Sequence, residues 1–392
     1  MKISDRITNI TGGGSDGWGV FYKARQMIAA GTPVTELTIG EHDIRTAKPI
    51  LDAMYQSALG GHTGYATVPG IPALRERVAA RIAARTGVPT KPENIVITPG
   101  GQAALFAAHL ATCGVGDTAA FIDPYYATYP GTIRGAGAIP RAIVTSPETA
   151  FQPTKEQLLS GTKGARSLLV NTPNNPTGVV YSAETLAAIA ESCIANDLWL
   201  ISDEVYDTQV WEGQHTSPRS LPGMLERTLV VGSMSKSHAM TGSRIGWICG
   251  PAEVVSHLIN LATHTNYGVP GFIQDAAHFA LGQGEAVEEE VAAPFRRRRA
   301  LTLDILSQQN LVQATPPQGA MYVMLDVRAT GMSGEAFALR LLDEEKIAVM
   351  PGESFGQAAA GHLRVAMTVA DDAYVDALKR LLACAQRCAS AS

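Results

Sequence analysis

The sequence predicts an α/β fold with a mostly parallel sheet, flanking helices and a smaller α+β lobe. Between residues 95 and 250, apolar strand-like runs alternate with helix-like segments such as 182–196, which is typical of parallel βαβ connections. From residue 315 onward, shorter strand-like and helix-like segments alternate. The 392 residues are long enough to form two domains with a sizeable core.

The N-terminal part begins with a glycine-rich segment, TGGGSDGWG at 11–19, followed by a helix-like run over 20–30 and a short strand ending at Gly40. No Gly-Lys-Ser/Thr follows the glycines, so the segment is interpreted as a loop and not as a phosphate-binding loop. Helical spacing over 49–59 and 72–85 predicts two helices, with Tyr65 in the loop between them.

The strands of the predicted sheet end in glycines, polar groups and aromatic groups. The run 95–98 leads into a glycine pair at the start of an Ala-rich helix, where backbone N–H groups favour a phosphate. Later strands lead into Tyr125 and Tyr126, into N-N-P-T-G and into S-D-E-V-Y. A parallel sheet gathers the residues after its strands along one edge: Gly100, Gly101, Tyr126, Asn175, Asp203, Ser233 and Lys236.

Lys236 lies just after the strand-like run 228–231, in the segment VGSMSKSHAMTGSRIGW. Its neighbours are hydroxyl groups at Ser233, Ser235 and Ser237, and Arg244 follows eight residues later before another strand-like run. An amine, several hydroxyls and a guanidinium suit a phosphorylated aldehyde, which the amine can bind as a Schiff base. The alternative is a solvated loop lysine.

The C-terminal half predicts helices over 250–261 and from residue 274, then one long helix over 285–310, broken near Pro294, that links to a second domain. The tail predicts strands in GAMYVMLDV, IAVMPG and HLRVAM, and helices over 334–345 and 374–389. We therefore expect a large domain over 46–285 and a small domain over 286–392, which the N-terminal segment 1–45 joins.

Composition excludes several other classes of protein. The net charge of −5 offers no electrostatic footprint for nucleic acid, and the basic run 296–299 follows an acidic run, as on a solvated helix face. The histidines lack metal-binding spacing, so no metal site is expected. Five cysteines without C-x-x-C spacing indicate reduced thiols. With no long apolar span and no signal-like N-terminus, we expect a cytoplasmic protein without a membrane partner.

Four motifs occur in one order along nearly the whole chain: N-N-P-T-G at 174–178, S-D-E-V-Y at 202–206, S-M-S-K with Arg244 downstream, and H-L-R-V-A near the C-terminus. In this the chain resembles the class I/II pyridoxal-phosphate aminotransferases of fold type I, the aspartate aminotransferase-like family. The resemblance implies pyridoxal 5′-phosphate as cofactor, the fold type I large domain for the parallel sheet, and ping-pong transfer of an amino group between an L-amino acid and a 2-oxo acid.

The resemblance also implies roles for individual residues. Lys236 would form the Schiff base and move the proton between substrate and cofactor. Asp203 would pair with the pyridine nitrogen, while Asn175 and Tyr206 would hydrogen-bond the phenolic oxygen. The remaining cofactor contacts would come from Gly101, Gln102, Ser233, Ser235 and Arg244 at the phosphate, Tyr126 on the ring, and Tyr65 reaching the phosphate from the partner subunit of a homodimer.

The substrate carboxylate would bind Arg364, helped by Asn175 and the backbone near Gly40. Several bacterial aspartate-type members of the family carry a lysine where this chain has Gln102, and no second arginine occurs in 264–270. We therefore expect a neutral or aromatic donor rather than an acidic one. The rival functions are a β-lyase on the same fold and a cofactor-binding regulator, for which residues 1–45 are too short and too uncharged to form a DNA-binding domain.

Overall fold

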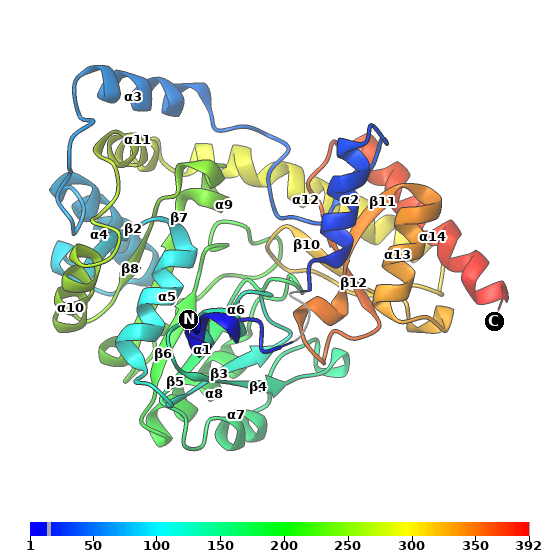
Figure 1. Ribbon diagram of the computed structural model, residues 1–392, viewed down its shortest axis with the longest axis horizontal. Coiled ribbons are helices and arrows are strands. Elements are labelled where there is room, and N and C mark those ends of the chain that lie inside the picture. The colour runs from blue at the N-terminus through cyan, green and yellow to red at the C-terminus, as the bar shows by residue number, and fades with distance from the viewer. Residues whose placement is uncertain (14–16, 392) are drawn as a thin grey trace.

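The computed structural model describes residues 1–13 and 17–391, which contain two β-sheets with helices packed against them (Figure 1). The larger sheet has seven strands in the order β2-β8-β7-β6-β5-β3-β4. All run parallel except β8, which is antiparallel to both neighbours. The strands are β2 (Ile95–Thr98), β3 (Thr118–Asp123), β4 (Ile139–Val144), β5 (Ser167–Asn171), β6 (Trp199–Asp203), β7 (Thr228–Ser233) and β8 (Gly246–Cys249).

Helices cover both faces of this sheet, which confirms the predicted α/β architecture. Alternate residues of β6 face opposite sides: Leu200 packs in the cluster with α7 and α8, and Ile201 packs in the cluster with α5 and α10. The helices around the sheet are α3 (Lys48–Leu59), α4 (Pro72–Thr86), α5 (Gly100–Thr112), α6 (Tyr129–Gly135), α7 (Lys155–Gly161), α8 (Ala183–Ala195), α9 (Met234–Ser237), α10 (Ala252–Thr263) and α11 (Gly271–Leu281).

The smaller sheet has five strands in the order β1-β11-β12-β10-β9. Its first strand comes from the N-terminal part of the chain and pairs in parallel with β11, Thr35 opposite Ile347. Figure 1 shows α2 (blue) beside the orange α13 on this sheet. The elements are β1 (Thr35–Leu37), β9 (Gln313–Thr315), β10 (Tyr322–Asp326), β11 (Ile347–Pro351), β12 (His362–Ala366), α2 (Gly19–Ala29), α13 (Gly334–Glu345) and α14 (Asp371–Ala391).

The predicted break at Pro294 is wrong. Helix α12 (Glu285–Ser307) continues through the proline and runs toward the smaller sheet (Figure 1). Proline removes one backbone donor and its ring crowds the carbonyl four residues earlier, but burial and charge fix the following turn. Phe295 is fully buried, and Arg298 pairs with Asp43 at 2.6 Å and with Asp371 at 2.8 Å. These contacts hold the helix on the C-terminal side of the proline.

Two further differences concern short segments. Strand β4 was not foreseen, because it is an edge strand with one buried residue and contains Pro140. The predicted glycine-rich loop at 11–19 includes residues 14–16, which lie outside the described residues; before it, α1 (Asp5–Thr8) is followed by turns. No helix within the described chain combines the length and apolarity needed to cross a membrane.

Candidate active site

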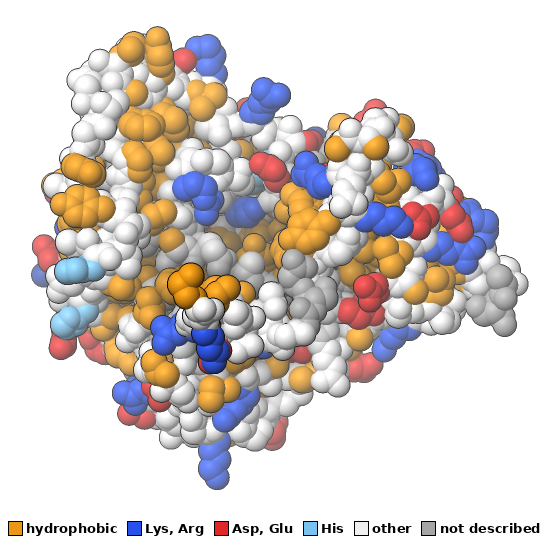
Figure 2. Space-filling view, in the orientation of Figure 1, with side chains coloured by type: hydrophobic (Ala, Val, Ile, Leu, Met, Phe, Trp, Pro, Cys, Tyr) orange, Lys and Arg blue, Asp and Glu red, His pale blue; other side chains and the backbone are white. Residues whose placement is uncertain are grey.

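A cavity of about 300 Å³ lies where the carboxyl ends of β5, β6 and β7 face the smaller sheet. Figure 2 shows this face of the molecule hollowed between the parts that carry the two sheets. The cavity brings together every predicted site residue except Tyr65: Gly40, Gly101, Gln102, Tyr126, Asn175, Asp203, Tyr206, Ser233, Ser235, Lys236, Arg244 and Arg364.

Lys236 lies in the short helix α9, directly after β7. The Ser233 hydroxyl accepts a hydrogen bond from the Ser235 backbone N–H at 3.0 Å and so caps this helix. The Lys236 amine donates to the Gly40 carbonyl. Burial lowers the pKa of Lys236, which raises the fraction of neutral, nucleophilic amine. A methyl group on Gly40 would overlap the Tyr322 hydroxyl, so this position has room only for glycine.

Asp203 is a buried carboxylate, 4% exposed, at the end of β6. It accepts hydrogen bonds from the Tyr129 hydroxyl at 2.7 Å and from the Val205 backbone N–H at 3.4 Å. Within the described chain no basic side chain forms an ion pair with it. Burial raises the pKa of Asp203 to about 6. A buried acid without a cation is poised to take a proton or a protonated ring nitrogen.

Arg364 on β12 is also buried, and no carboxylate among the described residues forms an ion pair with it. It is 1% exposed, donates to Asn175 Oδ1 at 2.9 Å and to the Thr38 carbonyl, and its Nε has no partner. Its guanidinium carbon lies 4.3 Å from the centre of the Phe355 ring and 4.5 Å from that of Tyr322. A permanently charged guanidinium in this setting suits an anionic ligand such as a carboxylate.

The first turn of α5 and Arg244 form a second anion-binding region. A methyl group on Gly100 would overlap the Arg244 guanidinium, so this side chain lies against the free N–H groups at the start of α5. The Ser233 and Ser235 hydroxyls are 2.8 Å apart at the edge of the same cavity. The amine, the unpaired acid and this anion cradle fit pyridoxal phosphate.

Tyr206 and Asn175 line the same cavity as the two anion-binding regions. Asn175 Nδ2 donates to the Tyr206 hydroxyl at 3.5 Å, and the Tyr206 and Tyr322 hydroxyls are 3.0 Å apart. Burial, with the neighbouring Tyr322, raises the pKa of Tyr206 well above its ordinary value. Tyr206 therefore stays a neutral hydroxyl that can donate to an oxygen atom in the cavity.

Two predicted residues need separate comment. The Gln102 side chain donates to Thr132 Oγ1 at 2.7 Å and accepts from Thr128 Oγ1 at 3.0 Å, so its amide is already paired. Tyr65 is 90% exposed, lies outside the cavity and packs on Tyr267 with ring centroids 5.1 Å apart. Within this chain Tyr65 does not reach the site.

Sequence reasoning missed several cavity residues. Asn171 ends β5 and could have been found by the same strand-end signal as Asp203. Tyr129 lies in the predicted Y-Y-A-T-Y segment but was not linked to Asp203. Tyr322 lies on β10, two residues from Met324, which pairs with Arg364 of β12, and no local pattern reveals this register. The others are Trp18, Ile39, Glu41, Leu105, Val205 and Thr241.

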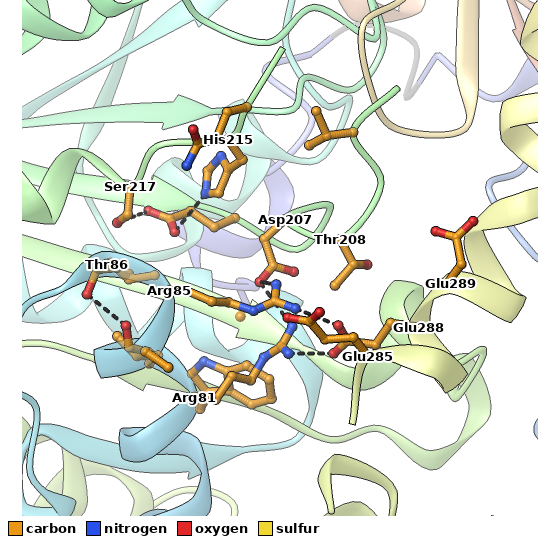
Figure 3. A pocket seen from close by; sticks show the side chains of 18 of the residues that line it. Arg81, Arg85, Thr86, Asp207, Thr208, His215, Ser217, Glu285, Glu288 and Glu289 are labelled. Atoms are coloured by element: carbon orange, nitrogen blue, oxygen red, sulfur yellow. Dashed lines mark hydrogen bonds and ion pairs between the residues drawn. The ribbon is translucent and has the colours of Figure 1, made fainter. Parts of the chain in front are cut away.

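A second cavity, of about 770 Å³, contains paired charges (Figure 3). Arg81 and Arg85 from α4 point toward Asp207 and Glu288, and form ion pairs with both. This cluster joins α4, the segment after Tyr206 and α12. Among the described residues, no group of three or more His, Cys, Asp or Glu side chains is arranged to hold a metal ion.

The fold and site define a pyridoxal-phosphate-dependent aminotransferase, and the chain belongs to the class I and II aminotransferase family, whose model matches residues 32–381. It is 40% identical over 386 residues to the arginine–pyruvate transaminase of Pseudomonas aeruginosa, covering 98% of each chain. It is 36% identical over 363 residues to the aspartate/prephenate aminotransferase of Thermus thermophilus, covering 91% and 92%.

Solved structures agree with these relatives. Aspartate aminotransferase from Thermus thermophilus with maleate superposes with a TM-score of 0.91 at 34% identity, covering 98% of this chain and all of that one. Aromatic aminotransferase from Pyrococcus horikoshii gives 0.87 at 29% identity, covering 93% and 99%. The predicted family, enzyme class and cofactor are thereby confirmed, and the alternative lyase is not favoured.

Proposed function

We propose that this chain transfers the amino group of an L-amino acid without a side-chain carboxylate to a 2-oxo acid, in two half-reactions at the 300 Å³ cavity. The observation that carries the proposal is that Arg364, buried with no ion-pair partner among the described residues, lies in the same cavity as the Lys236 amine. The first group binds the α-carboxylate that both substrates share, and the second acts at the neighbouring carbon.

Residues of the cavity have proposed roles in binding the cofactor or in moving a proton. The chemistry that pyridoxal phosphate supplies when bound is an aldehyde carbon for the amino group and a ring that accepts electrons. Lys236 provides the amine that takes and returns a proton at the substrate α-carbon. Asp203 would hold a proton at the ring nitrogen, and Asn175 and Tyr206 would donate hydrogen bonds to the ring oxygen. Gly101, Gln102 through its backbone, Ser233, Ser235 and Arg244 would hold the phosphate, and Tyr126 would contact the ring.

The class of amino donor follows from whether the cavity has a basic side chain with no other proposed role. Lys236, Arg244 and Arg364 are the basic residues that line the cavity among the described residues, and each has a role above. Gln102 is neutral and bound to Thr128 and Thr132. No basic group is left for a side-chain carboxylate, which supports the neutral or aromatic donor predicted from the sequence.

A cationic donor is the second candidate, because Glu41 lines the same cavity. Glu41 Oε1 accepts from the Thr241 hydroxyl at 3.4 Å, and no ion pair links it to a described basic residue. The arginine–pyruvate transaminase relative supports this candidate. A guanidinium or ammonium group can pair with the Glu41 carboxylate.

Replacing Glu41 with Gln separates the two donor classes. For a cationic donor, kcat/KM for arginine or lysine falls about 10- to 100-fold, because a charge-assisted pair worth roughly 1.5–3 kcal/mol is lost. For a neutral or aromatic donor, kcat/KM for leucine or phenylalanine stays within about twofold. Steady-state rates with each donor and pyruvate distinguish the two donor classes. The control is Glu36→Gln, which alters a carboxylate outside the cavity.

A visible absorption spectrum tests the function itself. We expect the purified protein to show the band of bound pyridoxal phosphate, and that band to convert to the pyridoxamine form when one amino acid is added without an acceptor. Restoration by a 2-oxo acid completes the cycle. Release of ammonia without an acceptor would instead indicate a lyase, and no band after incubation with pyridoxal phosphate would contradict the proposal.

We also propose a homodimer that shares its active sites. One face of α3 exposes Leu51, Tyr55 and Leu59, spaced by four residues, and Tyr65 lies beyond it at 90% exposure. An apolar stripe of this kind is stabilised by burial against a second copy. Docking there would carry Tyr65 to the partner's phosphate cradle, as the sequence predicts.

The double replacement Tyr55→Glu and Leu59→Glu is expected to convert the dimer to monomers, because two carboxylates would be buried without partners. Light scattering after size exclusion measures the mass. Tyr65→Phe should preserve the dimer and weaken the affinity for pyridoxal phosphate about tenfold by loss of one hydrogen bond to an anion. A monomeric wild type, or a charged double variant that stays dimeric, would contradict the arrangement.

The division into domains 1–45 with 286–392 and 46–285 remains a prediction. It is supported by the pairing of β1 with β11. A cytoplasmic location is also proposed, because no disulfide bond joins the cysteines of the described chain, as expected in a reducing compartment.

A further inference from the structure

Asp123 is a buried carboxylate that joins the two sheets at a distance from the cavity. It ends β3 in the larger sheet and is 2% exposed. Its two oxygens accept hydrogen bonds from the backbone N–H groups of Gln357 at 2.8 Å and Ala358 at 3.2 Å, in the segment between β11 and β12 of the smaller sheet. No side chain is hydrogen-bonded to this carboxylate among the described residues.

The segment fits closely around the carboxylate. A methyl group on Gly356, whose φ is +117°, would overlap Asp123 Oδ1. Next to this contact, the Tyr125 backbone N–H donates to the Phe355 carbonyl at 2.9 Å. Three hydrogen bonds therefore connect residues 123–125 with residues 355–358: two from backbone N–H groups to the Asp123 carboxylate, and one between backbone groups. Burying a carboxylate for this purpose costs free energy that an apolar contact would not, which indicates that the position of the segment matters.

The segment carries Phe355, whose ring lies 4.3 Å from the Arg364 guanidinium carbon. Phe355 is fully buried and packs with Met324, Met350 and Ala359, next to Trp18 of the cavity wall. Displacement of residues 355–358 would remove one of the two aromatic rings against Arg364. The guanidinium would then gain freedom to leave the orientation set by Asn175 and the Thr38 carbonyl.

We propose that Asp123 is a positioning residue for substrate recognition: it holds residues 355–358 against the larger sheet, and thereby keeps Phe355 on Arg364 and Arg364 aligned for the substrate carboxylate. The proposal rests on the role given above to Arg364. It gives Asp123, about which the sequence suggested nothing, a part in the affinity for both the amino acid and the 2-oxo acid.

The test is a double-mutant cycle with the pyridoxal-phosphate-loaded enzyme, using Asp123→Asn, Arg364→Lys and the combined variant. Asparagine keeps the shape of Asp123 but places an N–H₂ group against one of the two N–H donors. We expect Asp123→Asn to raise KM for the amino acid and Kd for pyruvate, measured by calorimetry, about tenfold, while kcat stays within about threefold. In the Arg364→Lys background, Asp123→Asn should raise KM and Kd by less than about a further twofold, because the guanidinium orientation that Asp123 maintains is already lost.

The matched control is Asp117→Asn. Asp117 lies just before the opposite end of β3, and also accepts a backbone N–H, from Gly114 at 2.8 Å. It should change stability without changing KM. If Arg364→Lys leaves Kd for pyruvate unchanged, the carboxylate role of Arg364 fails. If Arg364→Lys weakens pyruvate binding but Asp123→Asn does not, or if the two effects simply add, the positioning role of Asp123 is wrong.

Discussion

Replacing Lys236 with Ala is expected to lower the transamination rate by about 10⁴-fold or more, because the chain would lose both the amine proposed to bind the cofactor and the base proposed to move the proton. The structure offers no substitute. Within the described residues, the other basic groups of the cavity are Arg244 and Arg364, whose guanidinium groups do not deprotonate. Steady-state and single-turnover rates measure the loss.

A second readout does not depend on turnover. Borohydride reduction should attach the cofactor covalently to the wild-type chain and leave it removable from the Lys236→Ala variant. Lys48, which is exposed and paired with Asp52, provides the control, since Lys48→Ala should change neither rate nor labelling. A Lys236→Ala enzyme that still transaminates at the wild-type rate, or is still labelled at a single lysine, would remove Lys236 from its proposed role.

Replacing Asp203 with Asn should lower kcat about 100-fold or more, since an amide cannot hold a proton at the ring nitrogen and removing one preorganised electrostatic group costs roughly 3 kcal/mol. Glu204→Gln is the matched comparison. Glu204 is the next residue but bonds to Ser202, Ser217 and His215, away from the first cavity. We expect Glu204→Gln to lower stability and leave kcat within a few-fold.

Asp203 should also make the unfolding free energy of the cofactor-free protein depend on pH. Its pKa is about 6 in the folded chain, against an ordinary value of 3.8. The folded state therefore binds the proton more tightly, and this contribution is complete below about pH 4 and lost as pH rises through 6. Relative to Asp203→Asn, the wild type should lose on the order of 3 kcal/mol of unfolding free energy between pH 4 and pH 7. Denaturant unfolding at the two pH values measures this difference, and a constant difference would contradict it.

The sequence predicts the larger sheet and much of the site because both depend on local patterns. Strand-end residues such as Asp203 and Lys236 follow apolar runs, and parallel strands carry such ends to one edge. Helix boundaries at 72–86 and 334–345 agree with the structure to within a residue, since proline or a serine cap marks the start.

What the sequence does not show depends on pairings between distant segments. Tyr322 enters the cavity through the register of β10 with β12, and Asp123 meets residues 357–358 only after both sheets are in place. The charge cluster of Arg81, Arg85, Asp207 and Glu288 likewise cannot be recognised from the sequence, because its members are far apart in the chain (Figure 3). The sequence pattern also does not show that burial of Phe295 offsets the free-energy cost of Pro294 inside α12.

The pairing of β1 with β11 has a consequence for biosynthesis. Thr38 and Arg364, which meet at the substrate end of the cavity, are separated by 326 residues in the chain. At about 5–20 residues per second, a ribosome releases these two segments tens of seconds apart. All strands of the larger sheet have been synthesised well before that, whereas β1 cannot pair until β11 has been synthesised near the end of the chain. Nascent chains should therefore gain the proposed phosphate cradle first and Arg364, the proposed carboxylate-binding residue, last.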